Sequence, residues 1–165
     1  MQNRAKKIAL YGILSALCLV LGYLESLLPL DMIAPGIKLG LANAVALLLI
    51  ALGDIKGAVL VNITRILLSA LLFGSPFSLI FSLSGGIASL LVMSLLSGRK
   101  QFGTVGFSVC GAVAHNIFQL LAASVIIGQG VWYYLPVLLI AGSIGGILTG
   151  LLAGAVFKKT TTYFL

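Results

Sequence analysis

The sequence contains very little charge for its length. Only 8% of its 165 residues are charged, whereas 61% are hydrophobic. A soluble domain carries about 25% charged residues, so this chain has too few charges to cover a surface in water. We therefore expect an all-α integral membrane protein that forms a single transmembrane domain over residues 1–165.

Carboxylates are the scarcest charged groups. Glu25, Asp31 and Asp54 are the only three in the chain, and no two of them are adjacent. Such a chain cannot build the paired aspartates that hold magnesium and diphosphate in prenyl synthases. It also has no Walker A motif for binding ATP phosphates. We predict that the protein is not an enzyme and has no catalytic residue.

Metal ligands and disulfide partners are equally rare. Cys18 and Cys110 lie inside apolar segments, and His115 is the only histidine. No spacing of these residues is typical of a zinc site. We interpret the cysteines as small buried side chains and predict neither a metal site, nor a disulfide, nor a covalently bound cofactor.

Breaks containing glycine, proline or charge divide the chain into six hydrophobic segments. A helix of about 20 apolar residues crosses a bilayer. The second segment is short for this, so we expect it to be tilted or a half-helix. The predicted segments cover residues 8–28, 41–53, 57–73, 77–97, 105–128 and 136–157.

The basic residues indicate the orientation of this predicted six-helix transmembrane bundle. Cytoplasmic loops of membrane proteins are enriched in lysine and arginine, so both termini should be cytoplasmic. The net charge of +7 is then a topology signal, and we predict no nucleic-acid partner. The basic residues expected on the cytoplasmic side are Arg4, Lys6, Lys7, Lys56, Arg99, Lys100, Lys158 and Lys159.

Small residues recur at four-residue spacing in the first and last segments. Gly142, Gly146 and Gly150 follow this spacing, as do Ala5 and Ala9. Such spacing lets membrane helices approach closely. We expect packing within the bundle, although on the first helix the small residues are also suited to a partner membrane protein.

Arg65 is the most informative polar residue, because it falls near the middle of the third hydrophobic segment. Charges at this depth are costly and mark functional sites. Asn62 lies one turn earlier on the same helical face. Two interpretations stay open: Arg65 binds an anion or ligand, or it forms a structural ion pair with Glu25.

A second polar cluster, His115, Asn116 and Gln119, occupies one face of the fifth segment. We interpret it as a source of hydrogen bonds to a ligand. The alternative is a set of hydrogen bonds between helices, which is the commoner role of a membrane histidine.

The stretch APGIKLGLAN, residues 34–43, is irregular and polar between two hydrophobic segments. Irregular backbone at membrane depth is tolerated when it is buried by protein or lines a cavity. We expect Lys38, Asn43 and free backbone N–H groups to hold a polar or anionic ligand. The alternative is a connector that packs over the bundle. Trp132 and Tyr133 are interpreted as an interfacial aromatic belt or as a lid that stacks on a ligand.

Three of these features resemble the Gx transporter family, often labelled heptaprenyl diphosphate synthase component I. They are PGIKLGLAN (residues 35–43), the central Arg65, and GAVAHNIFQL (residues 111–120). The family is similar to the S-components of energy-coupling-factor vitamin transporters. The resemblance implies a six-helix, S-component-like protein of the bacterial cytoplasmic membrane, with a ligand pocket open to the outside.

The resemblance also implies a function. Members of this family are similar to proteins encoded beside extracytoplasmic flavin transferases, which implies transport of riboflavin, FMN or FAD for flavinylation outside the cytoplasm. It further implies an energy-coupling-factor-type transmembrane and ATPase module as partner. The expected ligand-binding residues are Lys38, Asn43, Asn62, Arg65, His115, Asn116 and Gln119.

Two other functions stay open at this point. A non-catalytic membrane subunit of heptaprenyl diphosphate synthesis would need a long apolar channel for its ligand. A structural assembly factor would have a closed bundle in which Arg65 pairs with Glu25. A flavin carrier would instead need a compact polar pocket.

Overall fold

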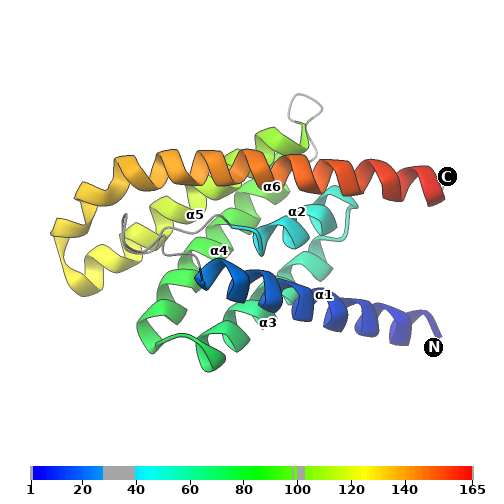
Figure 1. Cartoon of the computed structure of the whole chain (residues 1–165), viewed down its shortest axis with the longest axis horizontal. Helices are drawn as coiled ribbons and strands as arrows, with labels where there is room; N and C mark the ends of the chain where they lie inside the picture. Colours follow the sequence, from blue (N-terminus) through cyan, green and yellow to red (C-terminus); the bar gives the residue numbers. More distant parts are fainter. Residues whose placement is uncertain (1, 28–39, 98, 100–102, 165) are drawn as a thin grey trace.

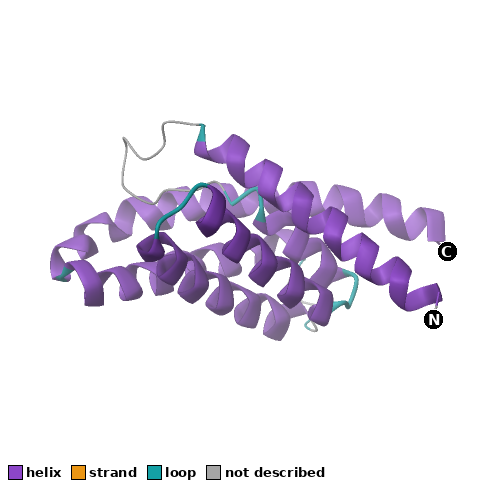
Figure 2. Ribbon diagram, turned by 90° about the horizontal axis from the view of Figure 1, so that it is seen from below, coloured by secondary structure: helices purple, strands orange, loops and turns teal. Residues whose placement is uncertain are grey.

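The computed structural model describes residues 2–27, 40–97, 99 and 103–164, and every regular element among them is a helix. Figure 1 shows that both termini lie at the same end of an elongated bundle. The connections that the structure describes in full, between α2 and α3, between α3 and α4 and between α5 and η2, are short (Figure 2). The elements are α1 (Gln2–Ser26), α2 (Asn43–Ala51), α3 (Ile55–Leu72), α4 (Pro76–Ser97), α5 (Thr104–Ile127), the 3-10 helix η2 (Gln129–Tyr134) and α6 (Leu135–Phe164).

Five of these helices, α1, α3, α4, α5 and α6, are long and apolar enough to cross a membrane. Helix α2 has nine residues, which span about 14 Å, or half of the hydrocarbon core. The prediction of a membrane-type all-helical chain is therefore confirmed. The second segment is a half-helix, as its length indicated, and does not form a sixth full span.

Helix α2 lies in the core although it is the shortest of the α-helices. Five of its nine residues are buried, including Leu47 and Ile50 at 1% and 2% exposure. A helix that is apolar on all sides needs protein or lipid around its whole circumference. The longer helices carry exposed side chains such as Ile8, Leu71 and Leu95, which are suited to contact with lipid.

Glycines on α6 bring its backbone close to the backbone of α5. A Cβ atom added to Gly146 would lie 2.8 Å from the Val109 Cα of α5, and one added to Gly150 would lie 2.7 Å from the Val105 Cα. The backbones of α5 and α6 therefore touch along this face, and the prediction of packing within the bundle is confirmed for α6. On α1, by contrast, a Cβ added to Gly12 would meet no atom within 4 Å.

A polar contact joins α1 to the turn before α3. The Tyr11 hydroxyl donates to Asp54 Oδ2 at 2.5 Å, and Asp54 Oδ1 accepts from the Gly57 N–H at 3.0 Å as the N-cap of α3. The hydrogen bond from Tyr11, followed by the Gly57 N–H and the charge of Lys7, lowers the pKa of the Asp54 carboxyl against the opposing effect of desolvation. The ionised carboxylate therefore stabilises the fold.

This contact predicts a pH-dependent effect of Tyr11→Phe. Because the folded pKa of Asp54 is lowered, its contribution to stability is present above the unfolded pKa of about 3.9 and is lost as pH falls through the folded pKa. At about pH 6 we expect Tyr11→Phe to lower the thermal midpoint in detergent by a few degrees. The gap to wild type should close as the pH falls through the folded pKa of Asp54.

Tyr23→Phe is the matched control, because Tyr23 lies on the same helix and its recorded contact is ring packing on Phe73, at 5.2 Å between centroids. This variant should track wild type at every pH. A gap between Tyr11→Phe and wild type that stayed constant over the whole acid range would contradict the role of the Asp54 carboxylate.

Candidate functional site

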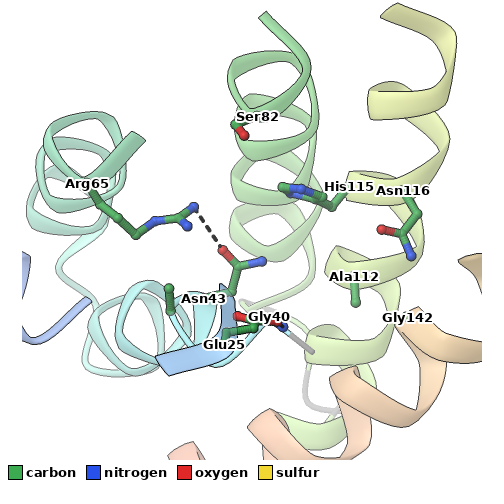
Figure 3. Close-up of a pocket in the computed structure, with 10 residues that line it drawn as sticks. Glu25, Gly40, Asn43, Arg65, Ser82, Ala112, His115, Asn116 and Gly142 are labelled. Atoms are coloured by element: carbon green, nitrogen blue, oxygen red, sulfur yellow. Dashed lines mark hydrogen bonds between the residues drawn. The ribbon is translucent and has the colours of Figure 1, made fainter. Parts of the chain in front are cut away.

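Arg65 projects from α3 toward the start of α2 (Figure 3). Its Nη2 donates to Asn62 Oδ1 at 2.9 Å and to Asn43 Oδ1 at 3.3 Å. A guanidinium group only donates hydrogen bonds, so the amide atoms facing it must be oxygens. Arg65 therefore fixes the orientation of both amides, and the amide nitrogen of Asn43 points away from it toward the His115 side of the site (Figure 3).

The Nε atom of Arg65 is buried and has no hydrogen-bond partner within the described part of the chain. A buried donor without a partner costs about 1–3 kcal/mol, and more when it is charged. Such a group is stabilised by a ligand or an ordered water. This atom is therefore the strongest sign that the surroundings of Arg65 accept another molecule.

The start of α2 is built around Gly40 and Glu25. Gly40 has φ +77°, a conformation that favours glycine, and its N–H donates to Glu25 Oε1 at 2.6 Å. The N–H groups of Asn43 and Ala44 are also occupied, at 2.8 and 3.1 Å from the Gly40 and Leu41 carbonyls. The expectation that free N–H groups bind a ligand is therefore wrong at these three positions, and the Asn43 side chain is what faces the site.

On α5, His115 and Asn116 lie next to glycines of the neighbouring helices. A Cβ added to Gly85 of α4 would lie 2.8 Å from the His115 carbonyl oxygen and 2.9 Å from its ring. Asn116 Nδ2 donates to the Leu138 carbonyl at 2.6 Å and lies against Gly142 of α6. This bond directs the Asn116 oxygen back toward His115 (Figure 3). A larger side chain at position 85 would meet the His115 backbone, so Gly85 allows α4 and α5 to pack closely.

These groups surround one pocket. We call it the central pocket. Residues from all six α-helices and from the turn before α2 line this pocket, and Figure 3 shows their arrangement. Its lining residues are Glu25, Gly40, Ala42, Asn43, Arg65, Ser82, Ala112, His115, Asn116 and Gly142.

The predicted ligand-binding residues are distributed unevenly around this pocket. Asn43, Arg65, His115 and Asn116 line it. Asn62 is 3% exposed and supports Arg65 from behind. Neither Asn62 nor Gln119 is on the lining itself, and Lys38 lies outside the residues that the structure describes.

The sequence analysis missed several lining residues. Ala112 and Gly142 leave the space that forms the pocket, and nothing in their types signals this. Ser82 and Glu25 are polar residues within apolar segments, so the criterion that selected Arg65 also applies to them. Trp132 packs against Leu120 and Leu138, and neither Trp132 nor Tyr133 lines the central pocket. A stacking role for them therefore has no support in this arrangement.

Comparison with known proteins identifies the family. No curated protein and no solved structure matches the chain. A family model described as heptaprenyl diphosphate synthase component I matches residues 14–156, a range that contains the central pocket. The chain therefore belongs to the heptaprenyl diphosphate synthase component I family of membrane proteins.

Proposed function

We propose that this protein is a membrane transporter that binds a small vitamin-like molecule, most specifically a flavin, in the central pocket. The observation that carries the proposal is Arg65, a charged side chain in an apolar helix that is held by two amides and keeps a buried Nε without a partner in the described residues. Burying a cation within an apolar helix costs free energy, and such residues commonly mark the binding site of a ligand.

The composition of the pocket supports a flavin over a prenyl chain. A flavin ring is planar, has carbonyl and N–H groups along one edge, and needs hydrogen-bonding partners there. The amide nitrogen of Asn43 and the guanidinium of Arg65 are donors, while the carboxylate of Glu25 and the amide oxygen of Asn116 are acceptors. A polyprenyl group would leave these polar atoms without partners.

The rival function is a non-catalytic membrane subunit of heptaprenyl diphosphate synthesis, which the family description suggests. That function calls for a long apolar channel. Six of the ten residues that line the central pocket have polar side chains, which favours the flavin. The assembly-factor alternative required Arg65 to pair with Glu25, whereas the recorded hydrogen bonds of Arg65 go to amide oxygens.

The proposal includes the orientation of the protein in the membrane. Both termini lie at one end of the bundle (Figure 1), and the basic residues of the termini would place that end in the cytoplasm of a bacterium. The flavin would reach extracytoplasmic flavin transferases. The open side of α1 around Gly12 would suit an energy-coupling-factor-type transmembrane partner with its ATPase module.

Equilibrium binding tests the proposal. Detergent-purified protein is titrated into riboflavin, FMN or FAD while flavin fluorescence is followed, with heptaprenyl diphosphate as competitor. We expect saturable quenching by at least one flavin, and no displacement by the prenyl compound at concentrations below its micelle formation. Absence of quenching by folded protein, or complete displacement by the prenyl diphosphate, would refute the proposal.

A further inference from the structure

A second layer of polar side chains lies next to the central pocket. It lines a smaller cavity, which shares Gly40, Asn43 and Ala112 with the central pocket. We call this cavity the second chamber. Its other lining residues are Leu47, Ser89, Met93, Ser108 and Thr149.

On each of three helices, one residue lines the central pocket and another, at the same spacing along the helix, lines the second chamber. Positions 82, 115 and 142 line the central pocket, and positions 89, 108 and 149 line the second chamber. Each pair is separated by seven residues, which is two helical turns or about 10 Å. Since α6 runs toward the C-terminus, the second chamber lies nearer the end of the bundle that carries both termini (Figure 1).

Hydroxyl groups dominate the polar surface of the second chamber. Thr149 donates its only proton to the Gly145 carbonyl at 2.8 Å. In its 3.0 Å contact with Ser108, Thr149 must therefore be the acceptor and Ser108 the donor. The Ser108 oxygen keeps its lone pairs for an occupant of the chamber.

Ser89 is a hydroxyl of the second chamber that is not bonded to its own helix. It is 3% exposed and lines the second chamber, and its side chain makes none of the hydrogen bonds found within the described part of the chain. Ser84 and Ser97 on the same helix donate to backbone carbonyls at 3.0 and 2.9 Å, the usual arrangement for serine in a membrane helix. A serine hydroxyl that faces a cavity and is not bonded to its own helix can donate one hydrogen bond and accept others, so Ser89 is placed to bond an occupant of the second chamber.

Among the residues that the structure describes, no charged side chain lines the second chamber, in contrast to the central pocket with Arg65 and Glu25. Burying a charged group such as a phosphate there would be costly, because nothing in the described lining neutralises it. The narrow chamber is therefore suited to an uncharged occupant with hydroxyl groups.

From this arrangement we infer that the second chamber binds the neutral, hydroxylated chain of a ligand whose ring lies in the central pocket. The inference rests on the proposed function and narrows it to an unphosphorylated flavin, with its polyol chain directed toward the terminal end of the bundle. Ser89 and Ser108 are then specificity-determining residues.

The test compares two flavins that differ only in the chain. Riboflavin carries the polyol chain, and lumiflavin carries a methyl group in its place. We expect Ser89→Ala to weaken riboflavin binding about three- to tenfold, as the loss of one hydrogen bond does, and to change lumiflavin binding less than twofold. Ser94→Ala is the matched control, since Ser94 bonds its own helix at the Leu90 carbonyl, and it should affect neither ligand.

A second variant fills the chamber instead of removing a bond. Ser89→Val should reduce riboflavin binding more than Ser89→Ala does, again with lumiflavin binding retained as a check of folding. In wild type, FMN should bind at least tenfold more weakly than riboflavin. Equal effects of the Ser89 variants on both flavins, no effect on riboflavin, or tighter binding of FMN would overturn this inference alone. Failure of wild type to bind either flavin would overturn the proposed function and the inference with it.

Discussion

Arg65→Ala is expected to weaken flavin binding by tenfold to more than a hundredfold. Hydrogen bonds to charged groups are worth about 1.5–3 kcal/mol, and each 1.4 kcal/mol is a tenfold change in Kd. The substitution also releases the Asn43 and Asn62 amides that Arg65 orients. Fluorescence-quenching titrations of the purified variant measure the effect.

Two further variants separate charge from geometry. Arg65→Lys keeps the charge, but an ammonium group is a point cation that does not reproduce the planar set of donors, so we expect an intermediate loss. Arg99→Ala removes an arginine that is exposed after the end of α4, and binding should not change. If folded Arg65→Ala protein bound flavin as tightly as wild type, Arg65 would have no part in recognition.

Gly146→Ala is expected to have the largest effect on the fold. The added methyl group would lie 2.8 Å from the Val109 Cα and 3.2 Å from its backbone nitrogen. Backbone atoms cannot rotate away, so α5 and α6 must separate. Overpacking of this kind costs about 1–3 kcal/mol, which should appear as a thermal midpoint several degrees below that of wild type in detergent.

Gly12→Ala is the matched control for this prediction. It makes the same chemical change in a helix, at a position where the added Cβ meets no atom within 4 Å. Because alanine favours helices over glycine, the thermal midpoint should stay level or rise slightly. If both variants had the same stability as wild type, the close contact between α5 and α6 would not hold the bundle together.

Much of the helical framework could be predicted, because its signals are local. Apolar length and the breaks at Gly74–Pro76 and Gln129–Pro136 place α3, α4, α5 and the start of α6 close to their observed bounds, whereas α6 continues to Phe164, beyond the predicted end at residue 157. The four-residue glycine spacing on α6 predicts packing, which the contacts of Gly146 and Gly150 confirm. The shared helical face of Asn62 and Arg65 is likewise borne out by their 2.9 Å hydrogen bond.

The site depended on contacts between helices, which spacing along one helix does not reveal. His115 and Gln119 are one turn apart, yet only His115 lines the pocket, because the neighbouring helices decide which part of a face is enclosed. Glu25 is bonded to Gly40, a pairing that depends on how α1 meets the start of α2. The second chamber could not be predicted from any one helix, because its lining residues come from several helices whose arrangement the sequence does not show.

The most direct test of the account is an experimental structure of the protein purified with riboflavin. We expect the flavin ring between α3, α4 and α5, within hydrogen-bonding distance of Arg65 and Asn43, with its polyol chain pointing toward Ser89. An empty pocket at saturating riboflavin, or an acyl chain occupying it with Arg65 turned away, would contradict the claim that this membrane bundle is built to carry a flavin.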